Sequence, residues 1–200
     1  MSSKEFFSPN GFLCRQQLAF LSMKIVTLCT GNVARSVMLG YMLETLAESQ
    51  GWSWEIRTAG TFAIENQGMS SRTFQSLSEL EELGEYDFAK HRSRQITDED
   101  VQWADVVFAS EADHVRFVRT KHAHGAHKVV QLKHFVATAP LDGPLGERVG
   151  AVSELAPDVI WDVVDPAGGD QAMYDATAQE LWDLTQALGV LLAEEYDPSL

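Results

Sequence analysis

The sequence has little cysteine: only Cys14 and Cys29 occur among its 200 residues. Two cysteines give no disulfide framework of the kind that staples small secreted domains, and they fit a reducing compartment. No apolar run approaches the roughly 18 residues that a membrane-spanning helix needs. We therefore expect a cytoplasmic protein without a membrane partner.

Positive charge is also scarce, with 15 lysines and arginines against 29 aspartates and glutamates, a net charge of −14. Such a surface repels nucleic acid and anionic membranes, which excludes both as expected partners. An anionic substrate would need a locally positive pocket that works against this field. No pattern in the sequence points to an oligomeric state.

The length of the chain predicts one domain with a short appendage. Residues 1–22 lack the compact basic start and the apolar core of a signal peptide. Met23 is an alternative start, because the first predicted strand opens at Lys24. We therefore predict an N-terminal extension over residues 1–22, non-native or disordered, and a single domain over residues 23–200.

Predicted strands and helices alternate along this domain. Short apolar runs predict strands over residues 24–29, 54–59, 104–109 and 129–132. Helical spacing and end signals predict helices over residues 36–50, 71–83, 98–103, 111–121 and 171–195. Residues 138–158 hold three prolines and three glycines and are predicted as a long loop with room for one helical turn. This alternation predicts an α/β fold of three layers, an open parallel four-stranded sheet with helices on both faces.

Ligands of such sheets bind at the carboxyl ends of the strands, so the loop after the first strand is the predicted site. This loop reads CTGNVARS over residues 29–36. Gly31 lets the backbone turn close to a ligand, and the amides of residues 30–36 can converge where the next helix begins. The loop is therefore predicted to cradle a phosphate dianion, and its predicted binding residues are Thr30, Gly31, Asn32, Val33, Ala34 and Ser36.

Cys29 and Arg35 stand at the two ends of this loop. The planar guanidinium of Arg35 can grip two oxygens of a phosphoryl group. Cys29 lies at the bottom of the same positive cup, where we expect a thiolate that attacks the bound phosphorus. Ser36 can donate a hydrogen bond to that thiolate, and Asn32 can tie the loop's backbone together.

At this point the sequence resembles the low-molecular-weight protein tyrosine phosphatase family, in its bacterial form. The resemblance rests on CTGNVARS, TAGT at 58–61, HRSRQIT at 91–97 followed by ADVVFAS, and DP at 165–166. It implies a protein-tyrosine phosphatase without metal or cofactor, acting on a phosphorylated protein or a small aryl phosphate. It also implies Cys29 as nucleophile, Arg35 as phosphate clamp, Asp165 as general acid, and a supporting network of Asn32, Ser36, Thr58 and His91.

Asp165 has two neighbouring rivals for the role of acid, Asp162 and Asp170. An aryl leaving group needs a proton, and a well-placed acid accelerates such a step roughly 10²–10⁴-fold. Pro166 stiffens the loop that carries Asp165. Taken alone, an Asp-Pro pair is equally explained by turn formation, and only the resemblance singles out Asp165.

The sequence departs from the family pattern around the pocket. Ala34 stands where many members carry a second cysteine, so a protective disulfide inside the loop is not expected. Val37 stands in place of a common proline, and Ala167 in place of an aromatic residue that lines the substrate pocket. Ala109–Ser110 replaces a common Met-Asp pair, and the segment 138–158 exceeds the usual connection.

Two further patterns have open interpretations. His122, His124 and His127 offer metal-ligating side chains, although a solvated loop explains them as well, and no metal site is predicted. Phe62 and Ile64 either form an apolar wall beside the phosphate site or pack under the loop 61–70.

The sequence leaves three alternatives to a tyrosine phosphatase. Arginine-phosphate phosphatases of the family tend to carry Thr where Val33 stands, and an apolar valine suits an aromatic ring better than a guanidinium. Arsenate reductases with a similar loop need further cysteines, and only Cys14 is available. A phosphate-binding module without turnover is the third alternative, suggested by Ala167.

Overall fold

The computed structural model describes residues 22–193. The extension predicted for residues 1–22 therefore lies outside the described residues, Ser22 excepted, as do the last two residues of the helix predicted over 171–195. None of the described helices combines the length and apolar character that crossing a bilayer requires.

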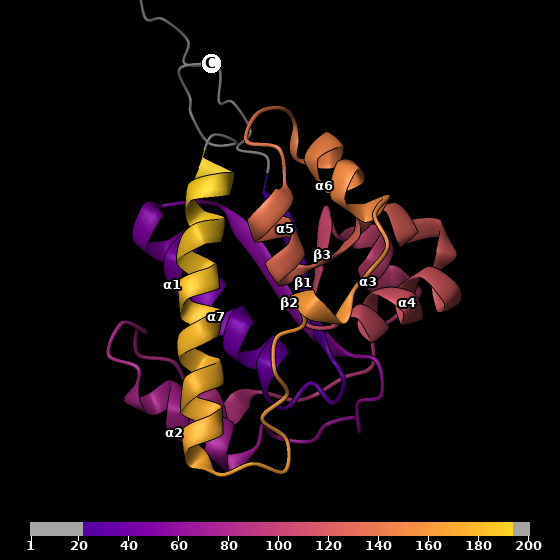
Figure 1. Ribbon diagram of the computed structural model, residues 1–200. Helices are drawn as coiled ribbons and strands as arrows, with labels where there is room; N and C mark the ends of the chain where they lie inside the picture. Colours follow the sequence, from indigo (N-terminus) through magenta and orange to yellow (C-terminus); the bar gives the residue numbers. More distant parts are fainter. Residues whose placement is uncertain (1–21, 194–200) are drawn as a thin grey trace, which may run out of the picture.

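Four parallel strands form one sheet, as predicted, in the order β2-β1-β3-β4 (Figure 1). They are β1 (Met23–Cys29), β2 (Trp54–Gly60), β3 (Val106–Ala109) and β4 (Val129–Gln131). The chain leaves β1 for β2 on one side and returns to β3 on the other. The loop after β1 consequently lies where the strand order reverses, the usual ligand site of open α/β sheets.

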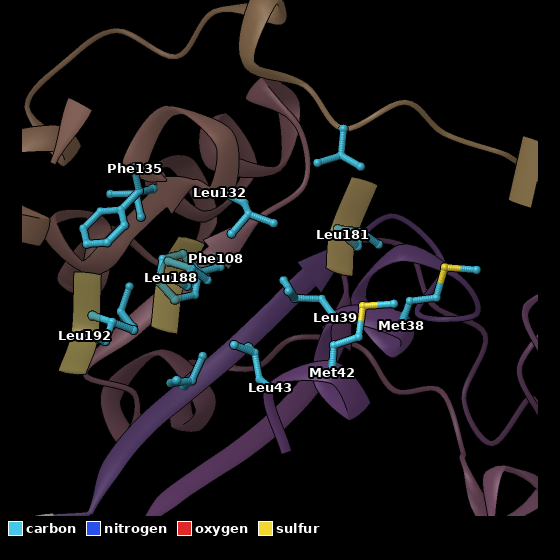
Figure 2. Close-up of a cluster of buried hydrophobic side chains, with 14 of the residues drawn as sticks. Met38, Leu39, Met42, Leu43, Phe108, Leu132, Phe135, Leu181, Leu188 and Leu192 are labelled. Carbon is cyan, nitrogen blue, oxygen red and sulfur yellow. The ribbon is translucent and has the colours of Figure 1, made fainter. Parts of the chain in front are cut away.

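Alternate residues of the central strands enter two different apolar clusters. Ile25 and Phe108 belong to the cluster beneath α1 (Arg35–Gln50) and α7 (Gln171–Leu192), which Figure 2 shows with the buried leucines of α7. Val26 and Val107 belong to the second cluster, shared with α3 (Asp98–Trp103) and α4 (Ala112–Lys121). Helices thus cover both faces and give the three predicted layers, and each fully buried side chain of this kind contributes roughly 1.5–3 kcal/mol.

Several helix ends follow the predicted signals. Gly51 caps the C-terminus of α1, and its φ of 69° is the left-handed conformation that favours glycine. α3 begins with a capping box in which Thr97 accepts from the amide of Asp100 and the carboxylate of Asp100 accepts from the amide of Thr97. These local signals fix the frame around the loop after β1.

The prediction for residues 71–83 was wrong at its end, because α2 spans only Ser71–Glu79. Leu80 is already extended, with ψ of 102°. Glu79, Glu81 and Glu82 would place negative charge at a helix C-terminus, where the helix dipole disfavours it. Leu80 and Leu83 still pack against the first cluster from the turn that follows.

The long loop predicted over residues 138–158 was also wrong. The chain forms α5 (Leu132–Thr138) directly after β4 and then α6 (Leu145–Ser153). Pro144 stands at the N-terminal boundary of α6, where a missing amide hydrogen costs nothing, instead of interrupting it. Leu145, Val149 and Val152 recur at helical spacing and are buried. Short 3₁₀ helices at Phe88–Lys90, Ala123–Lys128 and Val159–Trp161 complete the described elements.

Candidate active site

The loop after β1 has backbone amides that are available to bind a ligand. Cys29 ends β1 and is only 3% exposed, and α1 begins at Arg35. Within residues 22–193, no turn or loop hydrogen bond uses an amide of residues 30–36 as donor, and no side chain caps the N-terminus of α1. The free amides and the positive helix end together suit an oxyanion.

Asn32 organises this loop from its centre. Its φ of 52° lies in the left-handed region that asparagine tolerates better than most residues. Its Nδ2 donates to Ser36 Oγ at 3.0 Å and to Thr58 Oγ1 at 2.9 Å. The structure therefore brings three of the predicted supporting residues together.

The sulfur of Cys29 lies 3.0 Å from Ser36 Oγ, within hydrogen-bond distance. Because Ser36 Oγ already accepts from Asn32, the serine hydroxyl can direct its own hydrogen to the sulfur. A hydroxyl in this position can donate to the sulfur while the sulfur acts as a nucleophile.

His91 braces the loop from a distant segment. Its Nε2 lies 2.8 Å from the carbonyl oxygen of Asn32, and because that oxygen can only accept, Nε2 carries the hydrogen. Burial lowers the pKa of His91, so the ring is neutral near pH 7. The amide of Arg94 donates to Asn32 Oδ1 at 3.1 Å, which fixes the asparagine from the same segment.

Gly60 and two residues around the start of α2 support the loop from the other side. A Cβ atom on Gly60 would lie 2.5 Å from the carbonyl oxygen of Thr30, so only glycine allows this approach. The amide of Ser70 and the hydroxyl of Thr73 both donate to the carbonyl of Val33, at 3.0 and 2.9 Å. The TAGT motif thus includes a steric requirement that sequence reasoning did not identify.

Arg35 is buried, 1% exposed, and the protein itself already engages its guanidinium. Its Nη1 donates to the carbonyl of Val163 at 3.0 Å and to the carboxylate of Glu111. Its Nη2 lies 2.8 Å from Asp165 Oδ2, although the direction of that contact does not make a hydrogen bond. The Nη2 hydrogens therefore lack an acceptor among the described residues, as expected of a group meant for a ligand oxygen.

The three candidate acids have different partners. Asp162 accepts from the amide of Ala112 at 2.7 Å and from the Gln131 side chain at 2.8 Å. Asp170 caps α7 by accepting from the amide of Met173 at 3.1 Å. Asp165 alone of the three contacts Arg35, and its side chain is 39% exposed. Among these three aspartates, the geometry therefore places only Asp165 beside the guanidinium of the loop.

Glu111 and His114 are site residues that sequence reasoning missed. His114 Nδ1 accepts from the amide of Glu111 at 3.1 Å, so the hydrogen resides on Nε2, 2.9 Å from Thr30 Oγ1. Burial, reinforced by the charge of Arg35, lowers the pKa of His114 to about 3 and keeps the ring neutral. Both residues follow β3, whose carboxyl end adjoins that of β1, so only the strand order brings them to the site.

A cavity of about 440 Å³ opens beside the loop, lined by Thr30, Phe62, Glu111 and Phe117 among others. Phe62 is 72% exposed and lines this cavity, whereas Ile64 is 70% exposed and does not. Phe62 is thus a wall residue, and neither side chain packs beneath the loop 61–70.

The other unusual positions lie in different surroundings. Val37 is fully buried in α1 and does not line this cavity, whereas Ala167 is exposed beside Asp165. His122 lies 2.6 Å from a carboxylate oxygen of Asp98, and His124 lies 3.7 Å from the same atom. Residues 22–193 contain no group of three or more side chains arranged to hold a metal ion.

Comparison with known proteins places these features in context. Residues 24–144 match the model of a family described as low molecular weight phosphotyrosine protein phosphatase. A protein-arginine-phosphatase of Bacillus subtilis is 28% identical over 86% of this chain and 99% of its own length. The low molecular weight protein-tyrosine-phosphatase PtpB of Staphylococcus aureus is 30% identical over 81% of this chain and 94% of its own.

A solved structure shares the fold as well. It is a cysteine-to-serine mutant of YwlE arginine phosphatase with a phosphorylated active-site serine. The TM-score is 0.70 at 27% identity, and the match covers 87% of this chain and 98% of that one.

Proposed function

Because the chain belongs to the low molecular weight phosphotyrosine protein phosphatase family, it is a cysteine-dependent phosphatase, and we propose that it dephosphorylates phosphotyrosine in proteins with Cys29 as nucleophile. The observation that carries this proposal is the Cys29 sulfur, 3.0 Å from Ser36 Oγ, at the base of a loop with free amides. In the YwlE mutant, the serine that replaces a cysteine carries a phosphoryl group, which supports a covalent intermediate on the active-site cysteine.

In the first step, Cys29 Sγ attacks phosphorus and the bond from phosphorus to the tyrosine oxygen breaks. The hydroxyl of Ser36 steadies the thiolate, and the loop amides with Arg35 bind the equatorial oxygens. The phosphoryl group takes the Nη2 edge of Arg35, which frees Asp165 to carry a proton to the leaving oxygen.

In the second step, water attacks the phosphocysteine and the sulfur–phosphorus bond breaks. The Asp165 carboxylate takes a proton from the water, Cys29 leaves as a thiolate, and inorganic phosphate is released. Neither step requires a metal or cofactor. The same proposal includes a catalytic domain over residues 23–200, an extension over 1–22 and a cytoplasmic location.

Phosphoarginine is the second candidate substrate, because the Bacillus relative is a protein-arginine-phosphatase. Val33 argues for the aromatic substrate: its half-buried side chain has no group that could hydrogen-bond a guanidinium. Arsenate reduction would need partner thiols, and among residues 22–193 Cys29 is the one cysteine.

Matched assays of the full chain test the proposal. We expect hydrolysis of a phosphotyrosine peptide to exceed that of the same peptide with phosphoarginine, and no arsenate reduction when a thiol donor is present. Higher kcat/KM on phosphoarginine would instead select the second candidate. Absence of turnover together with tight phosphate binding would indicate a binding module.

Two cysteine variants test the nucleophile. Cys29→Ser should lose more than 99% of turnover, roughly a hundredfold or more, while it still binds phosphate. Cys14→Ser is the matched control and should turn over substrate like the wild type. Activity above a few per cent in Cys29→Ser would exclude the covalent mechanism.

A further inference from the structure

The cavity beside the loop borders the candidate active site and shares Thr30, Glu111 and His114 with it. Thr30 follows the nucleophile directly in the chain and lines the cavity. Glu111 lines it as well and binds Arg35. A volume of about 440 Å³ lies within the range of about 300–1,000 Å³ that ligand sites usually have. A substrate whose phosphoryl group rests on the loop therefore has room for a second group next to it.

Two aromatic rings form the apolar wall of this cavity. The ring of Phe62 meets the ring of Phe117 edge to face, with centroids 5.4 Å apart and an interplanar angle of 69°. Phe62 comes from the loop after β2 and Phe117 from α4, so the wall joins two separate elements. Phe62 is nevertheless 72% exposed, which leaves much of its ring available to an incoming side chain.

The charges around the cavity leave one cation unpaired. Glu111 is engaged by Arg35, and Asp113 pairs with Arg116 at 2.7 Å. The side chain of Lys121, which also lines the cavity, makes no hydrogen bond or ion pair with any described residue. On a chain of net charge −14, this unpaired lysine gives the cavity rim a local preference for an acidic group.

We propose that this cavity is a subsite for the residues that flank the phosphorylated residue of a protein substrate. It takes a neighbouring aromatic side chain against Phe62 and Phe117, and an acidic residue beyond it at Lys121. The inference rests on the proposed function and specifies its substrate: an acidic phosphopeptide with an aromatic residue beside the phosphotyrosine.

The test compares two sets of phosphotyrosine peptides with p-nitrophenyl phosphate, which has no flanking residues. One set carries phenylalanine beside the phosphotyrosine, on either side, and glutamate beyond it; the other replaces the phenylalanine by serine. In the wild type, phenylalanine should raise kcat/KM about tenfold, mainly through KM. In Phe117→Ala and Phe62→Ala, the ratio of kcat/KM on the phenylalanine peptide to that on p-nitrophenyl phosphate should fall by the same factor.

Lys121→Ala should lower that ratio about threefold, with a loss that shrinks at high salt. Lys90→Ala and Val190→Ala are the matched controls, an exposed lysine and an exposed apolar residue outside the cavity, and should leave the ratio unchanged. Equal kcat/KM for the two peptide sets in the wild type would overturn the subsite. So would an equal loss on peptide and p-nitrophenyl phosphate in Phe117→Ala.

Peptide affinity for Cys29→Ser separates this inference from the proposed function. If the wild type fails to hydrolyse any phosphotyrosine substrate, the proposed function is wrong. A phenylalanine-dependent gain in affinity that Phe117→Ala removes would still support the subsite, and its absence would overturn it.

Discussion

Asp165→Asn gives the sharpest test of the chemistry, because the structure predicts opposite effects on turnover and on phosphate binding. The carboxylate lies 2.8 Å from Arg35 Nη2, where a phosphate oxygen would compete with it. The variant keeps the size of the side chain but removes both its proton and its negative charge.

The loss of the proton should slow reactions that have a basic leaving group. A tyrosine oxygen, with a pKa of about 10, or an alkyl oxygen should lose roughly 10²–10⁴ in rate, which is about 2.7–5.5 kcal/mol of transition-state stabilisation. A nitrophenyl ester, whose leaving oxygen is weakly basic, should lose much less. The dependence of log rate on leaving-group pKa should therefore steepen in the variant.

The loss of charge should strengthen phosphate binding. In the wild type, phosphate must displace the Asp165 carboxylate from Arg35, and in the variant this ion pair is absent. We take its contribution as about 1 kcal/mol, a small value for an ion pair, because the Asp165 side chain is 39% exposed. Inorganic phosphate should then inhibit the variant at about fivefold lower concentration. Inhibition constants measured beside the leaving-group series give both results from one preparation.

The neighbouring aspartates are matched controls. Asp162→Asn should cost about 1–3 kcal/mol of stability, because it disturbs the acceptor of the Ala112 amide, and should affect all leaving groups alike. Asp170→Asn should behave like the wild type, since asparagine also caps helices. An equal loss across leaving groups in Asp165→Asn, with unchanged phosphate inhibition, would refute the reasoning and make Asp165 structural.

Three further predictions follow from single positions. Because Ala34 offers no thiol to Cys29, prolonged peroxide should inactivate the enzyme and dithiothreitol should fail to restore it; full recovery would contradict this. The pKa of His114 is lowered from 6.5 to about 3, so the unfolded state binds a proton as the pH drops below about 6.5 while the folded state does not. The free energy of unfolding should therefore decrease as the pH decreases, by about 2 kcal/mol between pH 7 and pH 5. Denaturant unfolding of His114→Gln should show a flatter pH dependence, and an unchanged curve would exclude this group as the cause. Gly60→Ala places a Cβ 2.5 Å from a loop carbonyl and should cost about 1–3 kcal/mol together with most activity, whereas Gly68→Ala, with open space around it, should be neutral by thermal unfolding and assay.

The loop after β1 could be predicted from sequence because its parts are contiguous. Strand, turn and helix start follow one another within residues 24–36, so Cys29 and Arg35 are brought to one site by local geometry alone. Thr58 and His91 were predicted from the family resemblance. In the structure, Thr58 accepts a hydrogen bond from the Asn32 side chain, and His91 contacts the backbone carbonyl of Asn32. The roles of these residues in catalysis stay predictions.

Glu111 and His114 could not be found in the same way. They reach Arg35 and Thr30 only because β3 pairs with β1, and strand order is a property of the whole fold. The helix α6 was missed for a different reason. The three prolines and three glycines of residues 138–158 favoured a loop, although Leu145, Val149 and Val152 recur at helical spacing. Proline at a helix start favours the helix, and composition alone does not distinguish that position from an interior one.

The loop around Cys29 is held by three segments that lie far from it in sequence, at residues 58–60, 70–73 and 91–94. Its conformational entropy is therefore lost when the domain folds, before any substrate arrives. Binding a phosphoryl group should leave the amide exchange of these bracing segments nearly unchanged, since nothing remains to be ordered. The same bracing ties the site to the global fold, so heat should abolish activity at the temperature where the core melts and not before it.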